Sequence, residues 1–287
     1  MWANYPSSLP FLERVWKQFR HGWWWLSQCI RQGQQPPVVL VWPDMPSRRT
    51  ALHKMTRNLG WELANKPRSA PLLGIHFEDA THKAIARLPG AMNNASTWWN
   101  AHCHDISKGN LDHHHQATFG YGMRIDPTSH QGPLVVKSDE NAKHDGALVQ
   151  GPIDPNDVQE HVVYQREIDN RDPSGRHFDY RVVYIRGSLP VIYIKYKASD
   201  SRFTNETSQV DLLAASPFTP DEEACMDRLA RSMRVDYAEF DALRDRNSNQ
   251  LYVVDVNPTP WGPPAQLVPE LQEEAVNRMA QCLKASL

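Results

Sequence analysis

Two carboxylates and one amide near the C-terminal end of the chain have the residue types and spacing of a divalent-cation site. Asp255 and Asn257 lie two residues apart in the β-rich run 252–257, so in a strand both side chains point to the same face. A turn through 246–249 predicts a hairpin that brings Asp241 beside them. Their oxygens are hard ligands suited to Mg²⁺, which completes its shell with waters or phosphate oxygens. The three residues therefore predict a magnesium site that takes a nucleotide.

A simpler interpretation of the same segment stays open. Asn257 and Pro258 could form an ordinary turn at the end of a surface hairpin, because Asn is common before Pro in turns. Asp255 argues against it, since a carboxylate within a strand of valines is costly to bury unless a partner lies beside it. A nearby cation is the economical explanation.

A lysine followed by a polar loop offers a place for phosphate groups. Lys137 ends the strand-like run 133–137, and the loop after it closes at Gly146. A lysine at a strand end reaches phosphate oxygens, and a loop that closes over them excludes water from the transfer. The alternative for Lys137 is a solvent-exposed strand end, which is the usual environment of lysine.

Two charged pairs have the spacing of one strand face. Asp179 and Arg181 lie two residues apart, and so do Lys195 and Lys197. The two runs that carry them flank the turn at 186–189, which predicts an antiparallel hairpin. A charged rim on that hairpin is the alternative for the lysine pair.

The elements that position these residues predict an α/β chain in two parts. The first part, 1–115, begins its α/β unit with a buried strand at 38–42, and the second, 116–287, is rich in strands. Thr219, Pro220 and Glu222 form the capping box of a helix whose apolar stripe faces a sheet. Other strands are expected at 119–125, 134–137, 161–168, 180–185, 191–196, 235–243 and 251–256, and a last helix at 271–283.

The order of these motifs resembles the ATP-grasp superfamily over residues 117–265. The stretch 240–260 resembles the metal-binding hairpin of these enzymes, and Asp179-Tyr-Arg181 is similar to the motif of the glutathione-synthetase-like, glutamate-adding branch. The chain departs from the family in two places. Asp255 stands where many members carry Glu, and the loop before Gly146 has a single glycine where the family is often glycine-rich.

The resemblance implies a fold and a set of site residues. ATP would lie between two α+β subdomains, preceded by a smaller N-terminal α/β domain. The implied Mg²⁺ ligands are Asp241, Asp255 and Asn257. The implied residues of the nucleotide site are Lys137, His144, Gly146, the hinge Gln165, Arg166, Glu167 and Ile168, and Asp179 at the ribose. Arg181, Lys195 and Lys197 would act on phosphate, acyl phosphate or substrate carboxylate.

The implied activity is that of a carboxylate–amine ligase. ATP would phosphorylate a small-molecule or peptide carboxylate with release of ADP, and an amine or other nucleophile would attack the acyl phosphate. A kinase on the same scaffold, or an inactive nucleotide-binding homologue, stays open. No protein nucleophile is needed, which fits a chain without a convincing Ser-His-Asp or Cys-His arrangement.

A different class of function would be a metal-binding module. Histidines cluster around Cys103 and at 113–115, although they lack the paired spacing of structural zinc sites. Near the N-terminus, Trp16, Phe19, Trp23 and Trp24 fall at helical spacing beside basic residues. We expect this helix to pack on the N-terminal domain, with a membrane-surface helix as the less favoured interpretation.

Composition narrows the remaining classes. Lys and Arg number 31 and Asp and Glu 33, so no whole-chain basic field exists to hold nucleic acid or an acidic membrane. The four cysteines are scattered without CxxC spacing, which suits a reducing compartment. We therefore expect a cytoplasmic protein that binds no nucleic acid and does not need a membrane; a homodimer is left open.

Overall fold

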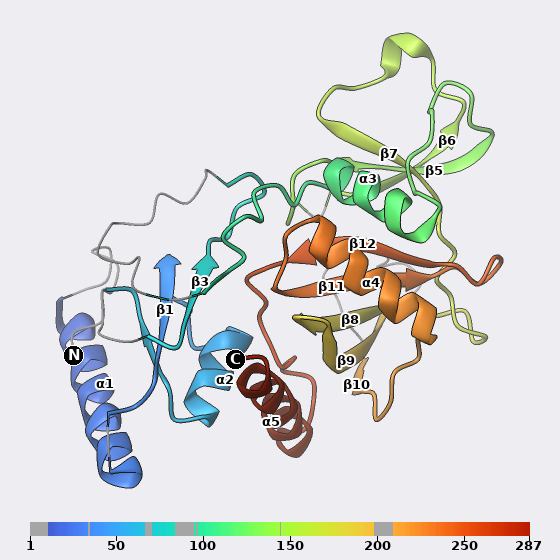
Figure 1. Cartoon of the computed structure of the whole chain (residues 1–287). Coiled ribbons are helices and arrows are strands. Elements are labelled where there is room, and N and C mark those ends of the chain that lie inside the picture. Colours follow the sequence, from blue (N-terminus) through green and yellow to red (C-terminus); the bar gives the residue numbers. More distant parts are fainter. Residues whose placement is uncertain are drawn as a thin grey trace.

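A computed structural model describes residues 11–33, 35–66, 71–83, 95, 97–143, 145–197 and 209–287. The chain forms a mixed α/β structure with three separate sheets, as predicted (Figure 1). Among the described residues, no helix has the length and apolar character needed to cross a membrane.

The N-terminal unit is built on a four-stranded parallel sheet in the order β2-β1-β3-β4. Its central strand is the predicted apolar run, since four residues of valine and leucine are best buried between covering elements. The elements are α1 (Phe11–Gln32), β1 (Val38–Pro43), α2 (Ala51–Asn58), β2 (Glu62–Ala64), β3 (Leu73–Phe77) and β4 (Trp98–Trp99).

The remainder of the chain forms two antiparallel sheets with helices beside them. The small sheet has the order β6-β5-β7, and the large sheet has the order β10-β9-β8-β11-β12. The small-sheet part comprises α3 (Lys108–Phe119), β5 (Gly132–Ser138), β6 (Ala147–Gly151), the short 3-10 helix η2 (Pro155–Asp157) and β7 (Val162–Arg166). The large-sheet part comprises β8 (His177–Ile185), β9 (Ser188–Lys197), β10 (Gln209–Leu212), α4 (Pro220–Ser232), β11 (Tyr237–Arg244), β12 (Leu251–Asn257) and α5 (Pro269–Ala285).

Most of the elements expected from sequence are present. The hairpin β8–β9 turns at Arg186 and Gly187, both with positive φ, and β11 pairs with β12 as predicted. The capping box of α4 is complete, with Thr219 Oγ1 accepting from the Glu222 N–H at 3.2 Å. The apolar stripe of this helix packs on the large sheet through Met226 and Leu229.

The strand expected at 119–125 is absent. Residue Phe119 ends α3, and Gly120 follows with φ 82° as a left-handed cap. Asp112 then accepts hydrogen bonds from the N–H groups of Met123, at 2.6 Å, and Arg124, at 3.0 Å. A buried carboxylate thus shapes this segment into a turn instead of a strand.

The packing of the apolar stripe on α1 also differs from expectation. The helix forms, but Trp16, Phe19 and Trp23 are 59%, 63% and 69% exposed. The helix contacts the N-terminal unit through its other side, where His21 and Gln28 are buried. The predicted packing is therefore wrong for Trp16, Phe19 and Trp23, whereas Trp24 lies against the Arg57 guanidinium of α2.

One apolar core joins the N-terminal sheet to the large sheet. Its buried side chains come from β1, β3 and α2 on one side and from β8, β9, β11 and α5 on the other. Figure 1 shows α5 between α2 and the large sheet. The division predicted at residue 115 stays a prediction; it falls within α3, which contacts α4 and β12.

Candidate functional site

A cavity of about 600 Å³ lies between the small sheet and the large sheet. Its lining contains most of the residues predicted for the site: Lys137, Gly146, Gln165, Arg166, Ile168, Asp179, Arg181, Lys197, Asp241, Asp255 and Asn257. The predicted residues Glu167 and Lys195 do not line it. Residue His144 lies outside the part of the chain that the structure describes.

The pairing of β11 with β12 brings the predicted metal ligands together. Asp241 and Asp255 lie directly opposite each other in the ladder, and Asn257 lies opposite Glu239. A β-bulge follows Asp241, which locally re-aims the strand. Directly opposed residues share a sheet face, so the two carboxylates face the same space. The geometry expected of the three residues is present, and their role as ligands stays a prediction.

The two facing carboxylates, Asp241 and Asp255, are candidate ligands for a cation. Burial and, after it, the neighbouring Asp241 carboxylate raise the pKa of Asp255 to about 6, while the positive charges of Lys108 and Lys137 oppose the shift. Among the described residues, no three His, Cys, Asp or Glu side chains are grouped to hold a metal. Oxygen ligands beyond the two carboxylates would come from the Asn257 amide and from phosphate. The Asn257 Oδ1 already accepts from the N–H and Oγ1 of Thr259, at 2.9 and 3.1 Å, so ligation requires these bonds to rearrange.

Sequence reasoning missed a buried acid beside the pair. Glu239 is 3% exposed, and its Oε1 accepts from Nη1 of Arg181 at 2.9 Å. The same guanidinium contacts Asp241, with Nε and Oδ1 3.3 Å apart. Burial raises the pKa of Glu239 to about 7, against the opposing effect of Arg181. The available signal was its position two residues before Asp241, which puts both acids on one strand face.

The other predicted charges form a second group on β8 and β9. Asp179 Oδ2 lies 3.0 Å from Nζ of Lys197, and Asn170 Nδ2 donates to Asp179 Oδ1 at 3.4 Å. Lys195 is the ladder partner of Asp179. Burial, together with the positive charge of Arg181, lowers the pKa of Lys195. Asp179 is thus paired with Lys197. Its contact with ribose stays a prediction.

Lysines face the acidic pair from the small sheet and from α3. Burial and the nearby Lys108 lower the pKa of Lys137 to about 8, while the charge of Asp255 opposes the shift. Lys108 lines the same cavity, and burial also lowers its pKa. Sequence reasoning did not identify Lys108, whose only signal was its place at the start of a helix.

The loop between β5 and β6 is anchored to the start of α3 and to the N-terminal unit. The N–H of Gly109 donates to Asp139 Oδ1 at 2.7 Å, and the N–H of Asn141 donates to Thr81 Oγ1 at 2.9 Å. Within the loop, Ser138 N–H donates to Asp145 Oδ1 at 3.1 Å. The loop residues that line the cavity are Asn141, Ala142, Lys143, Asp145 and Gly146. The β5–β6 loop therefore lines the cavity and is held by hydrogen bonds at Asp139 and Asn141. Its predicted role over the phosphates stays a prediction.

The predicted adenine hinge consists of the last two residues of β7 and the two residues that follow it. The N–H of Arg166 donates to the carbonyl of Met123 at 2.8 Å, so it is not available to a purine edge. Ile168 is buried and packs with Met123 and Tyr252. Glu167 lines a separate cavity of about 310 Å³. The role of this segment in binding adenine stays a prediction.

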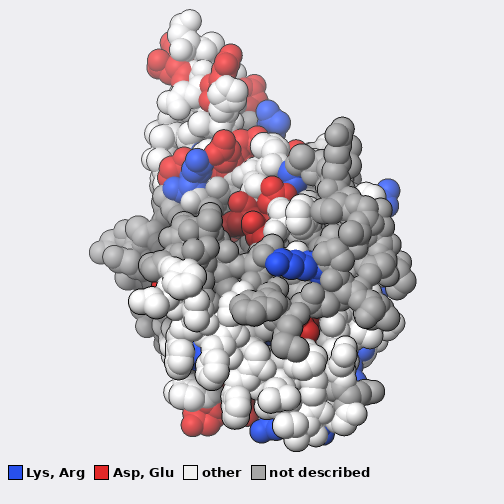
Figure 2. All heavy atoms as spheres, turned by 90° about the vertical axis from the view of Figure 1, so that its left-hand side faces the viewer, with Lys and Arg blue, Asp and Glu red and all other residues white. Residues whose placement is uncertain are grey.

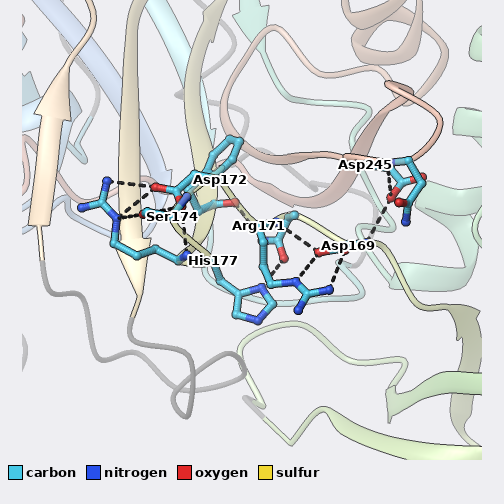
Figure 3. A network of polar contacts seen from close by, with 10 residues as sticks. Asp169, Arg171, Asp172, Ser174, His177 and Asp245 are labelled. Atoms are coloured by element: carbon cyan, nitrogen blue, oxygen red, sulfur yellow. Dashed lines mark hydrogen bonds and ion pairs between the residues drawn. The ribbon is translucent and has the colours of Figure 1, made fainter.

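The connection from the hinge to the large sheet is held by a polar network (Figure 3). Asp169 takes a bidentate pair of bonds from Arg171, both at 2.7 Å, and its N–H donates to Asp245 Oδ1 at 3.2 Å. Asp172 binds Ser174 and Arg176 in the following turn. Paired charges at both ends make this connection a fixed spacer between the two walls of the cavity.

The histidine cluster does not form a metal centre. His115 is fully buried and stacks on Phe119 with ring centroids 4.2 Å apart, while its Nδ1 contacts the carbonyl of Tyr121 at 3.0 Å. Cys103 is also fully buried, within the core under the large sheet. Among the described residues, no three His, Cys, Asp or Glu side chains are grouped to hold a metal, so the structure lends the metal-module hypothesis no support.

Comparisons with known proteins identify relatives by fold. No protein-family model matches the sequence, and no curated protein sequence matches it. The ATP-grasp ligase PsnB complexed with a minimal precursor is similar with a TM-score of 0.54 at 10% identity, covering 88% of this chain and 99% of that chain. PsnB has also been solved with Mg and ADP, at a TM-score of 0.52 and 11% identity.

Two further structures are similar over nearly their whole length. D-alanine–D-alanine ligase from Bacillus anthracis complexed with ATP has a TM-score of 0.51 at 13% identity, covering 88% of this chain and 97% of that chain. A RimK domain protein of the ATP-grasp type from Sphaerobacter thermophilus has a TM-score of 0.50 at 14% identity, covering 87% and 98%. At such identities the likeness concerns the fold.

Proposed function

We propose, on the premise that this chain has the ATP-grasp fold, that it is an ATP- and Mg²⁺-dependent ligase that forms ADP. It would join a carboxylate to an amine or another nucleophile through an acyl phosphate. One observation carries the proposal: Asp241 and Asp255 face each other across the ladder in a cavity whose lining also includes Lys137 and the β5–β6 loop. Two acids and a lysine around one space match the charges of a metal–triphosphate complex.

The side chains divide the chemistry between them. Asp241, Asp255 and Asn257 would hold Mg²⁺, which when bound supplies positive charge to the phosphate oxygens. Lys137 would contact the phosphates from the small sheet, and the β5–β6 loop would exclude water. Arg181 lies against Asp241 and would bind the substrate carboxylate or the transferred phosphoryl group.

The proposed reaction has two steps. A carboxylate oxygen of the substrate bonds to the γ-phosphorus while the bond to the bridging oxygen of ADP breaks. The nucleophile then bonds to the carbonyl carbon, and inorganic phosphate leaves. Lys195 and Lys197 lie on β9 on the side of Asp179, where they would offset charge on the acyl phosphate.

The substrate class and compartment are part of the proposal. PsnB has been solved with a precursor peptide, and the Bacillus anthracis enzyme is a D-alanine–D-alanine ligase. These neighbours support a peptide or small-molecule carboxylate as the substrate. All four cysteines are free thiols, which supports a reducing cytoplasm.

Nucleotide binding and turnover test the proposal. Calorimetric titration with ATP and Mg²⁺, followed by ADP-release assays across carboxylates and amines, should show turnover that requires both substrates. Asp255→Asn should reduce turnover by about 100-fold or more, because it removes charge from the cation site. Asp157→Asn, at an exposed position in η2, is the matched control. Unchanged turnover in Asp255→Asn would refute the site. A stable phosphoester formed on a substrate hydroxyl, with no amine present, would indicate a kinase.

A further inference from the structure

The outer side of α1 is an apolar surface without a partner among the described residues. Its large apolar side chains are 47–78% exposed: Phe11, Leu12, Val15, Trp16, Phe19, Trp23, Leu26 and Ile30. Figure 1 places α1 at the edge of the molecule, away from the large and small sheets, and the lower part of the face in Figure 2 is mostly uncharged. A contiguous apolar face of this size on a globular protein marks an interaction site.

The opposite side of α1 is docked, so the exposed side cannot turn inward. His21 and Gln28 are 7% and 9% exposed, and His21 Nε2 lies 3.7 Å from Oε1 of the buried Glu62. The guanidinium of Arg57 lies 3.6 Å from the ring centroid of Trp24. Together these contacts fix the rotation of the helix about its axis.

The exposed residues follow a heptad spacing. Six of them are separated by alternating steps of four and three residues: Leu12, Trp16, Phe19, Trp23, Leu26 and Ile30. This is the spacing of the a and d positions at which two helices interlock. No charged residue interrupts the seam formed by these six positions.

A column of smaller residues, spaced two helical turns apart, runs beside the seam. It consists of Val15, Gly22 and Cys29. A Cβ added at Gly22 would meet nothing within 4 Å, so packing within one chain does not require a glycine there. A glycine inside a helix lowers helix stability, and its usual benefit is the close approach of a second backbone.

We propose that the seam of α1 pairs with the same seam of a second copy, in antiparallel orientation about a twofold axis. In that register Trp16 meets Leu26 of the other copy, and Phe19 meets Trp23. The small column lies beside its own counterpart, with Gly22 one residue from the axis. In a parallel pair each tryptophan would instead meet the same tryptophan of the other copy, and such layers of two bulky rings pack less well.

The area available suits a stable dimer. Each of the eight side chains leaves on the order of 100 Å² exposed, so the face offers roughly 800 Å², which is what one partner contributes to a standard interface. The helix carries four basic residues and one acidic residue, so an anionic lipid surface is the competing occupant. A lipid surface, however, requires neither the heptad spacing nor the small column.

Mass measurement with a matched pair of variants tests the proposal. Sedimentation of the full chain at micromolar concentration should give twice 32.9 kDa. Leu26→Glu should raise the dimer dissociation constant by about tenfold or more. Leu148→Glu on β6, where the leucine is 48% exposed against 47% for Leu26, should leave it unchanged. Circular dichroism would establish that both variants keep their helices.

A cross-link tests the orientation independently. In the antiparallel register Val15 and Cys29 of the other copy lie on the same flank of the seam, offset by about 3 Å along the helix axis. Oxidation of Val15→Cys should therefore give a disulfide to native Cys29 between chains. Within one helix these positions are about 21 Å apart, too far for a disulfide. Mass spectrometry of the linked peptides reads the result. A monomeric wild-type chain, or a monomer that co-sediments with anionic vesicles and forms no such link, would overturn the proposal.

Discussion

The two faces of the large sheet use the same strands for opposite purposes. Along β11, Ala238, Phe240 and Ala242 lie in the apolar core under α4. The residues between them, Glu239 and Asp241, face the cavity side with Arg181. Because side chains alternate along a strand, one segment of eight residues builds both the support and the site. The comparison teaches that stability and function here are separable by single-residue steps.

The largest effect is expected on the face of the large sheet that packs under α4, which we call the supporting face. Phe240 is fully buried and stacks on Tyr184 with centroids 5.4 Å apart. Phe240→Ala should lower the free energy of unfolding by about 3–5 kcal/mol, because it removes buried apolar surface and leaves a cavity. Urea denaturation monitored by fluorescence measures the change. A loss below about 1 kcal/mol would mean that α4 can close onto the vacated space.

The next effect is expected at a histidine in the packed N-terminal unit. His53 on α2 is largely buried near Arg57, and burial lowers its pKa to about 4. Since the unfolded chain takes up the proton near pH 6.5, the free energy of unfolding should fall by about 3 kcal/mol as the pH falls from 6.5 to 4. His53→Gln should lose about 2 kcal/mol less than wild type between pH 7 and pH 5 in urea titrations. Equal losses would contradict the assignment.

On the opposite face of the large sheet, which lines the cavity, removing a charge should raise the free energy of unfolding instead of lowering it. Asp255 and Asp241 face each other, and their repulsion destabilises the protein without a cation. Asp255→Asn should therefore raise the free energy of unfolding in metal-free buffer by about 1 kcal/mol. Thermal melts with and without Mg²⁺ measure this, and the gain should shrink when Mg²⁺ is added to both proteins. A loss of stability would mean that Asp255 supports the fold.

The smallest effect is expected at the edge of the supporting face. Thr219 caps α4 in a box completed by Glu222, which also binds Arg244 of β11. Thr219→Ala should lower the free energy of unfolding by about 1 kcal/mol, whereas Thr219→Ser should retain most of it. Denaturant midpoints of the two variants decide the matter, and equal midpoints would show that the hydroxyl adds nothing.

Local patterns predicted what depends on neighbouring residues in sequence. The capping box at Thr219, the β8–β9 hairpin and the pairing of Asp241 with Asp255 are all present. These features follow from turn chemistry and from the two-residue period of strands. The fold could therefore be inferred in outline, and so could the main acids of the site.

Contacts between distant segments could not be predicted in this way. Asp112 captures the N–H groups of Met123 and Arg124, which turns an expected strand into a loop. Lys108 reaches the cavity because α3 begins beside the β5–β6 loop. The outward face of α1 was missed because a periodic apolar stripe does not say which surface it meets.

The core shared by the N-terminal sheet and the large sheet limits how this protein can be taken apart. Side chains of α5, such as Ala275 and Met279, lie fully buried in the same cluster as Leu52 and Met55 of α2. Detaching the N-terminal unit would leave α5 and the lower half of the large sheet uncovered in water. We therefore expect the two halves to unfold together, and a replacement for the N-terminal unit would have to cover the same helix.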